Sequence, residues 1–283
     1  MTVTDRARMK TFAPFPIAVL TAALLSSSAN AGEPPASQDD WKFTLSIASL
    51  YSPAFTGSKD YQAMVVPDLK IEYKDRLFIS LFDGIGYNVI NSHGWRAGPI
   101  AKFDFGRQED DSNPFRIAGK KTNALRGLGD IDPTAELGGF LEYSLDPVSF
   151  KVELRQGVNG HKGFIGEVSV DYTDMIEVFG PPILFGIGPR LTFADSRYNN
   201  AFFGINQIQS FRSGLPQYDA KTGLLSYGVG GFAMMQVTDT ISVSVFGGYD
   251  RLGDQAAKSP LVKQRGSANQ FSLGLAVSYQ FGL

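Results

Sequence analysis

The chain offers few of the side chains that catalysis uses. It contains no cysteine and only 2 histidines. A hydrolytic site needs a nucleophile, a base and an orienting acid within contact distance of one another. His93 stands in the turn-like run 91–94 and His161 in the glycine-rich run 157–163, and the strand pattern described below places these runs at opposite ends of the molecule. We therefore expect both histidines to be ordinary turn residues and the protein not to be an enzyme.

Cofactor and metal motifs are equally sparse. Residues 127–132, with the sequence GLGDID, resemble a phosphate-binding loop, but no Lys-Ser/Thr pair follows them. Asp130, Asp132 and the acidic run 109–111 lack the ligand spacing of a defined calcium loop. No zinc or haem motif is present. We expect turn structure in this region and no cofactor.

The remaining charged residues occupy alternate positions in segments that are otherwise apolar or small. Such alternation is typical of strands that turn their charges to one face. We expect the following charges to face an interior: Lys70, Arg96, Lys102, Glu136, Glu142, Lys151, Glu153, Arg155, Glu167, Asp171 and Arg190. Because the two signs nearly balance, we expect ion pairs and side chains to fill that interior. Solvated charges lining a water-filled pore are the alternative.

The clearest strand pattern occupies residues 269–283. Apolar side chains fill every second position, and small or polar residues stand between them. The apolar positions are Phe271, Leu273, Leu275, Val277, Tyr279, Phe281 and Leu283. A strand with this pattern has one wholly apolar face, which we expect to contact membrane lipid. A strand can lie in hydrocarbon only when both of its edges are paired in a closed barrel, so the rest of the chain must supply the neighbouring strands.

The first 31 residues have the pattern of a secretory signal peptide. Basic residues precede an apolar segment at 17–25, and the small residues Ala29 and Ala31 form a cleavage site. With 43% hydrophobic residues and a slightly negative mean hydropathy, the chain does not have the composition of a helical membrane protein. We expect a signal peptide at 1–31 and one barrel domain at 32–283.

The fold that these patterns predict is an all-β, transmembrane, antiparallel up-and-down barrel of about 12 strands. An even strand number with short turns on one side requires the stretch 77–90 to break at Asp83-Gly84. We expect 106–133, 195–223 and 250–268 to be long polar loops on the outer side. Residues 195–223 are expected to form a single loop, with room for a small hairpin.

Several short motifs, in order and spacing, resemble the MipA/OmpV family of outer-membrane proteins. They are Tyr51-Ser52-Pro53, Asp83-Gly84-Ile85-Gly86-Tyr87-Asn88, the run 127–132, Ser213-Gly214-Leu215 and Leu252-Gly253-Asp254. The resemblance implies a barrel in the outer membrane of a Gram-negative bacterium, in contact with its lipid. It also implies, as partners, a murein lytic transglycosylase and a penicillin-binding protein. The formal net charge of −2 gives no support to nucleic-acid binding.

Two functions remain open from the sequence. The first is a non-enzymatic scaffold or adaptor for peptidoglycan-remodelling proteins of the cell envelope, or a surface-binding protein of the same kind. The second is a small-solute porin that works through its interior. An interior filled by ion pairs favours the first function.

Overall fold

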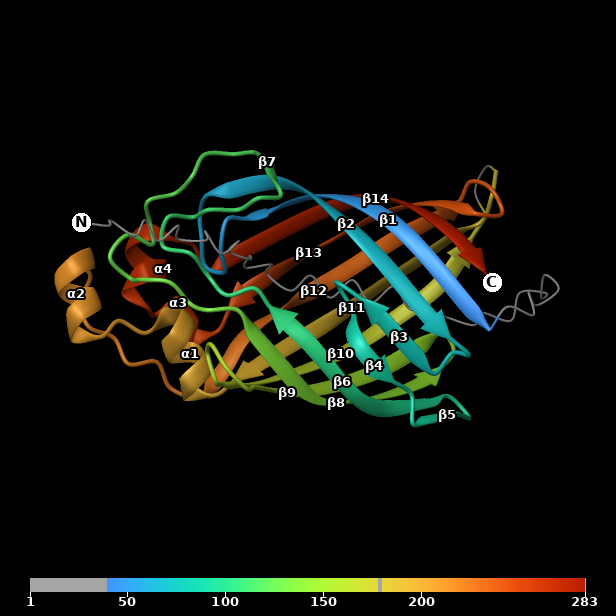
Figure 1. The fold of residues 1–283 in the computed structure, drawn as a ribbon, viewed down its shortest axis with the longest axis horizontal. Helices are drawn as coiled ribbons and strands as arrows, with labels where there is room; N and C mark the ends of the chain where they lie inside the picture. Colours follow the sequence, from blue (N-terminus) through green and yellow to red (C-terminus); the bar gives the residue numbers. More distant parts are fainter. Residues whose placement is uncertain (1–39, 178–179, 283) are drawn as a thin grey trace, which may run out of the picture.

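The computed structural model describes residues 40–177 and 180–282. The expected signal peptide at 1–31 and the apolar residue Leu283 lie outside the described residues. The described chain forms one closed barrel with four short helices gathered at one end (Figure 1). Among the described residues, no helix is both long enough and apolar enough to cross a membrane.

The barrel wall is built from antiparallel neighbours in chain order. Its strands are β1 (Trp41–Pro53), β2 (Tyr61–Tyr73), β3 (Leu77–Ser80), β4 (Gly84–Tyr87), β5 (Ile90–Ser92), β6 (Trp95–Asp104), β8 (Thr134–Leu145), β9 (Val148–Gly157), β10 (Phe164–Ile176), β11 (Ile183–Ala194), β12 (Gly223–Gln236), β13 (Ile241–Leu252) and β14 (Asn269–Gly282). Pairing of β1 with both β14 and β2 closes the wall. Because β4 and β5 share one place beside β6, the wall has 12 strand positions. The predicted fold class is confirmed.

The alternation of β14 is visible in its burial. Leu275 is 49% exposed, whereas the next residue, Ala276, is 8% exposed and faces the interior. Aromatic pairs lie on the outer surface towards the ends of the wall, including Trp41–Tyr73 with ring centroids 4.5 Å apart. An outward apolar face bordered by aromatic rings is the arrangement that lipid contact requires.

Tight turns join the strands at the end opposite the helices. The β2–β3 turn places Lys74 and Asp75 at φ 49° and 52°, and the β5–β6 turn places His93 at φ 52°. Asp146-Pro147 joins β8 to β9. In bacterial barrels the short turns face the periplasm, so the helical end is the outer end.

The predicted break in 77–90 is confirmed. Strand β3 ends at Ser80 and β4 begins at Gly84, with a turn between them. Gly84 has a φ of +86°, and a Cβ there would lie 2.4 Å from the Ala101 carbonyl oxygen. Glycine is needed at this position because other residues rarely adopt that conformation and would clash. The β3–β4 hairpin therefore stops well short of the outer end of the wall.

The prediction of a single loop at 195–223 was wrong. This segment contains α1 (Ser196–Phe203) and α2 (Gln207–Ser213). Asp195 accepts a hydrogen bond from the Tyr198 backbone N–H, and Asn206 forms a capping box with Gln209. The segment folds because apolar side chains such as Phe203, which is 1% exposed, pack into the mouth of the barrel, each contributing about 1.5–3 kcal/mol.

The other long loops also pack against the mouth, so they do more than extend into solvent. Helices α3 (Asp254–Ala257) and α4 (Pro260–Arg265) lie in 250–268, and β7 (Arg116–Ala118) in 106–133 pairs with the outer end of β2. Two buried clusters join the loops to the wall. Their residues are Ile131, Ile165, Ala194, Phe202, Phe203, Leu225, Leu252, Ala256 and Val262 in one, and Ala54, Phe55, Ala124, Leu125, Leu128, Ile205, Leu215 and Leu261 in the other. We call segments 54–60, 105–133, 195–222 and 253–268 together the cap.

Candidate functional site

A cluster of buried ion pairs lies on the interior side of β6, β8, β9 and β10, and Arg155 of β9 is its centre. Arg155 Nε donates to Glu136 Oε2 at 2.7 Å and Nη2 to Glu167 Oε1 at 2.7 Å. Its third contact, from Nη1, is to Glu153. The Arg155 side chain is 1% exposed. Strands β8, β9 and β10 are neighbours in the wall, and this pairing brings the charges at their interior positions side by side.

Two lysines complete this cluster. Lys102 Nζ on β6 lies 2.7 Å from Glu153 Oε1, and Lys151 Nζ lies 3.1 Å from Glu153 Oε2. Charged groups in a dry interior are tolerated only when they are paired and hydrogen-bonded. The charges of the cluster are all paired, although Lys102 Nζ and Glu153 Oε2 have ion-pair contacts without a hydrogen bond.

The other charges expected inside form separate groups. Arg96 pairs with Glu142, and Arg190 donates from Nε to Asp250 Oδ1 at 2.8 Å. Lys70 lies 3.2 Å from Glu72 and 3.7 Å from Asp83, and Asp171 accepts from the Ser169 hydroxyl at 2.8 Å. Asp250 and Asp83 are not among the site residues predicted from the sequence. Asp250 also stands at an alternate position in an apolar strand, so the same signal could have found it.

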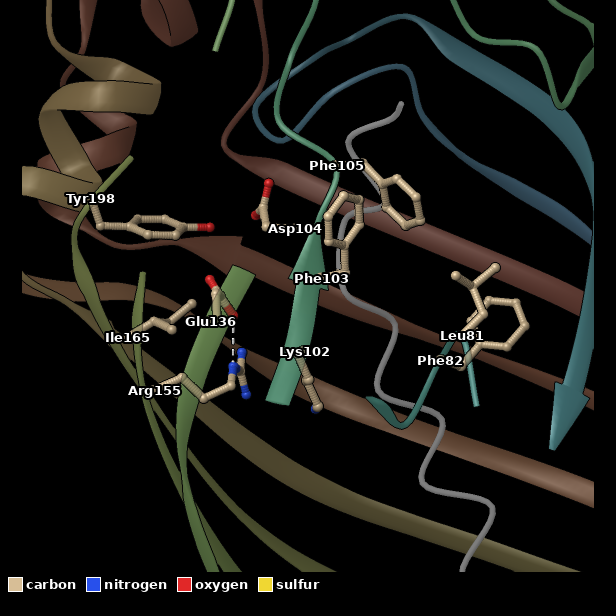
Figure 2. Close-up of a pocket in the computed structure, with 10 residues that line it drawn as sticks. All are labelled: Leu81, Phe82, Lys102, Phe103, Asp104, Phe105, Glu136, Arg155, Ile165 and Tyr198. Carbon is tan, nitrogen blue, oxygen red and sulfur yellow. Dashed lines mark hydrogen bonds and ion pairs between the residues drawn. The ribbon is translucent and has the colours of Figure 1, made fainter. Parts of the chain in front are cut away.

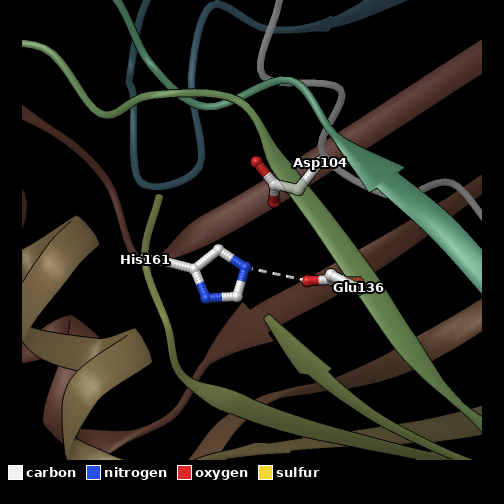
Figure 3. Close-up of side chains that lie close together, drawn as sticks. All are labelled: Asp104, Glu136 and His161. Atoms are coloured by element: carbon white, nitrogen blue, oxygen red, sulfur yellow. Dashed lines mark hydrogen bonds and ion pairs between the residues drawn. The ribbon is translucent and has the colours of Figure 1, made fainter. Parts of the chain in front are cut away.

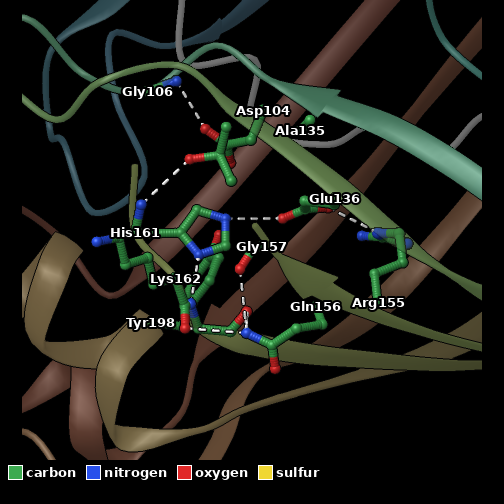
Figure 4. A network of polar contacts seen from close by, with 12 residues as sticks. Asp104, Gly106, Ala135, Glu136, Arg155, Gln156, Gly157, His161, Lys162 and Tyr198 are labelled. Atoms are coloured by element: carbon green, nitrogen blue, oxygen red, sulfur yellow. Dashed lines mark hydrogen bonds and ion pairs between the residues drawn. The ribbon is translucent and has the colours of Figure 1, made fainter. Parts of the chain in front are cut away.

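His161 corrects a second expectation. It lies in the β9–β10 loop but is 5% exposed, so it is no ordinary turn residue. Its Nε2 lies 3.0 Å from Glu136 Oε1, and its Nδ1 accepts a hydrogen bond from the Gly163 backbone N–H at 3.0 Å (Figure 4). A Cβ at Gly157 would lie 2.6 Å from His161 Cε1, so the glycine makes room for the ring. His93, by contrast, is exposed in its turn.

Asp104, Glu136 and His161 come close enough to raise the question of a metal. Their possible ligand atoms lie within 4.8 Å of one another (Figure 3). Because the Gly163 N–H points at Nδ1, that nitrogen carries the lone pair and Nε2 carries the proton, which it donates to Glu136. A metal at Nε2 would need the proton on Nδ1, where ligating histidines normally donate to an acceptor. This arrangement is that of a hydrogen-bonded network and does not suit a metal centre.

A pocket opens beside this network (Figure 2). It is lined by Leu81, Phe82, Lys102, Phe103, Asp104, Phe105, Glu136, Arg155, Ile165 and Tyr198. In Figure 2 the Tyr198 hydroxyl and the Asp104 carboxylate point into the same space from α1 and from the end of β6. The pocket therefore combines apolar and ionised walls.

The glycine-rich run 127–132 has a structural task. The Gly127 and Gly129 backbone N–H groups donate to the two carboxylate oxygens of Glu109 at 2.7 and 2.9 Å. Asp130 Oδ1 in turn accepts from the Glu109 N–H at 2.7 Å. The anion held by these glycines is thus a carboxylate of the same chain.

Arg107 links two segments of the cap, the loop 105–133 and helix α1. Its guanidinium donates to the Phe202 carbonyl oxygen at 2.5 Å, and the residue is 3% exposed. Burial lowers the pKa of Arg107 to about 10, and the charge of Asp130 opposes this effect. The cap is therefore held by a buried cation in addition to apolar packing.

Known proteins resemble this chain in sequence and in structure. The family model described as MltA-interacting protein MipA matches residues 45–281. Outer membrane protein OmpV of Vibrio cholerae serotype O1 is 26% identical over 160 residues, which are 56% of this chain and 59% of that protein. The matched region thus spans somewhat over half of the length of that relative.

Solved structures of outer-membrane barrels also align with the chain. The NanC porin has a TM-score of 0.41 at 11% identity, with 83% of this chain and 98% of that chain covered. The COG4313 outer membrane channel from Pseudomonas putida F1 has a TM-score of 0.39 at 12% identity, with 88% and 100% covered. The family model matches nearly the whole barrel, and the relative OmpV is an outer-membrane protein. This chain therefore belongs to the MipA family of outer-membrane barrels and is located in the outer membrane.

Proposed function

We propose that the protein is a non-catalytic scaffold of the outer membrane that holds peptidoglycan-remodelling proteins near the cell wall. The observation that carries this proposal is the closed interior. The Arg155 cluster fills the interior side of β6, β8, β9 and β10, and the cap packs buried phenylalanines into the mouth of the barrel. A barrel without an open path for solutes acts through its surfaces.

The histidine network supports a non-catalytic function. Both ring nitrogens of His161 are engaged, one by Glu136 and the other by the Gly163 N–H. A general base must instead have a free lone pair directed at the proton it removes. The buried network gives the barrel rigidity, which a scaffold needs.

The family description gives the candidate partner. It names a MltA-interacting protein, and we propose a murein lytic transglycosylase, together with a penicillin-binding protein, as the partners of this chain. They would meet the periplasmic turns. The β2–β3 turn offers exposed charges there, with Lys74 Nζ 3.0 Å from Asp40 and Lys42 Nζ 3.5 Å from Asp75.

Site-specific photo-crosslinking in intact cells tests the proposal. A crosslinking residue is placed at Asp75 in the turn, at Phe211 of the cap, which is 93% exposed, and at Leu275 on the lipid face as the control. We expect a crosslinked product containing a lytic transglycosylase from position 75 and none from 275. Products from position 211 alone would contradict the periplasmic scaffold and assign binding to the cell surface.

A further inference from the structure

The barrel wall has a break above the β3–β4 hairpin. Strand β3 pairs with β2 only at residues 71–73, and β4 pairs with β6 only at Ile100 and Ala101. On the edge of β2 that faces β3, residues 65–70 have no ladder partner among the described strands, and β7 pairs only with residues 63 and 64. The outer end of β6 also has no ladder partner on the side that faces β4. Intact barrels pair every strand edge at membrane depth, so this part of the wall differs from the rest.

Individual contacts close the edges of the break without filling it. Asp68 Oδ1 accepts from the Leu81 backbone N–H at 2.7 Å, and the Val65 N–H donates to the Phe115 carbonyl oxygen at 3.0 Å. Phe82 packs inward against the buried cluster that includes Met64. The edges are thus satisfied by side chains and a loop in place of a strand.

Both outward-facing and inward-facing residues of the wall line the pocket at this place. Leu81 and Phe103 line its outer part and are 38% and 50% exposed on the lipid face, whereas Asp104, Glu136 and Tyr198 line its inner part. The enclosed volume of the pocket is about 40 Å³, which is room for a compact polar group such as an ammonium head group. Figure 2 shows Phe103 and Phe105 on one side of the space and the charged groups on the other.

The inner end of the pocket has an excess of negative charge. The ion-pair cluster and its neighbour comprise the cations Lys102, Lys151 and Arg155 and the carboxylates Asp104, Glu136, Glu153 and Glu167. His161 is uncharged, because its Nδ1 accepts the Gly163 N–H. The three cations form ion pairs with the three glutamates. The carboxylate of Asp104 is not part of these ion pairs and accepts a hydrogen bond from the Gly106 N–H at 2.6 Å.

We propose that this lateral pocket binds a single-chain amphiphile with an ammonium head group. The alkyl chain lies between Leu81 and Phe103 at the lipid face, and the ammonium group donates hydrogen bonds to Asp104. Charge complementarity selects the head group, because a buried cation gains most from a carboxylate that no other cation neutralises. A membrane lipid with a free amine and a water-borne alkylamine share this chemistry.

Binding of decylamine and of decanoate to the purified protein in neutral maltoside micelles tests the proposal. Isothermal titration is corrected for partitioning into micelles without protein. We expect decylamine to bind at least about tenfold more tightly than decanoate. The substitution Asp104→Asn keeps the acceptor for Gly106 and should erase this difference. Phe103→Ala should weaken decylamine binding, whereas Phe193→Ala, which removes an outward ring from β11, a strand that does not line the pocket, should leave it unchanged.

Heat-dependent gel mobility establishes that each variant is folded before its binding is compared. Equal or tighter binding of decanoate, an unchanged preference in Asp104→Asn, or equal losses in Phe103→Ala and Phe193→Ala would overturn the proposal. Mass spectrometry of protein taken directly from membranes distinguishes the two sources. A retained amine-bearing lipid that decylamine displaces supports the membrane source, and tight decylamine binding to protein that retains none supports the water-borne source.

Discussion

His161 Nε2 lies 3.0 Å from Glu136 Oε1, and this contact ties the β9–β10 loop to the wall strand β8. The other oxygen of Glu136 accepts from Arg155 Nε at 2.7 Å. One carboxylate therefore joins the outer loop to the ion pairs of the interior. The ring also packs on Tyr198 of α1, with centroids 4.8 Å apart, so the same histidine connects the cap to the barrel.

The substitution His161→Ala should destabilise the protein, because it leaves Glu136 without its neutral donor and Gly163 without its acceptor. We expect a loss of about 1–3 kcal/mol in the free energy of unfolding, measured by urea titration with gel mobility as the readout. The matched control is His93→Asn in the exposed β5–β6 turn, where asparagine tolerates the positive φ of 52°. Equal losses in both variants would contradict the account of the network.

The substitution Arg155→Met should have a larger effect. It removes the cation that bonds Glu136, Glu153 and Glu167. Breaking a buried ion pair by removing one partner costs about 3–5 kcal/mol. Lys42→Met is the control, since its contact with Asp75 is 3.5 Å long and its side chain is 40% exposed. Exposed pairs of that kind contribute about 0–1 kcal/mol. The same urea titration measures both variants, and similar stabilities would show that the interior is solvated.

The substitution Arg107→Ala should loosen the cap without unfolding the barrel. Loss of a buried hydrogen bond from a charged group costs about 1.5–3 kcal/mol, which corresponds to about tenfold or more in the local opening of α1. Trypsin should then cut faster at Arg197 and Arg212. Arg126→Ala removes an exposed arginine from the same loop and should leave the cutting rate unchanged. A rate that Arg107→Ala does not raise would count against the link to Phe202.

The lipid face of β14 can be tested by placing a charge on either side of the strand. Leu275→Arg places the charge among lipid chains, where it costs about 2–4 kcal/mol near mid-bilayer. Ser278→Arg places it inside, near the periplasmic end, where the native hydroxyl lies 2.8 Å from that of Ser46. We expect the first variant to reduce the yield of assembled barrel in membranes more than the second. The reverse order would mean that the strand is turned by one residue.

The barrel itself could be predicted because its signal is local. Apolar residues alternate along β14, and the requirement for an even strand number located the break at Asp83-Gly84. The position of His161 could not be predicted, because its burial depends on Glu136, which is 25 residues away in the sequence. Strand periodicity carries no information on how a loop folds back over the barrel mouth.

The sequence before each of the first two cap helices contains a helix-capping signal. Asn206 and Gln209 have the spacing of a capping box, and Asp195 is an N-cap residue. The helices have only 8 and 7 residues, too short for apolar periodicity to stand out. Phe202 and Phe203 therefore resembled part of a polar loop, although they fill the mouth of the barrel.

The closed interior is the central claim, and the conductance of the purified wild-type protein in a planar lipid bilayer tests it most directly. With the Arg155 cluster in the interior and the cap in the mouth of the barrel, we expect insertion without stable open steps. Large, stable, ion-selective steps would contradict the account and assign the protein the function of a small-solute porin.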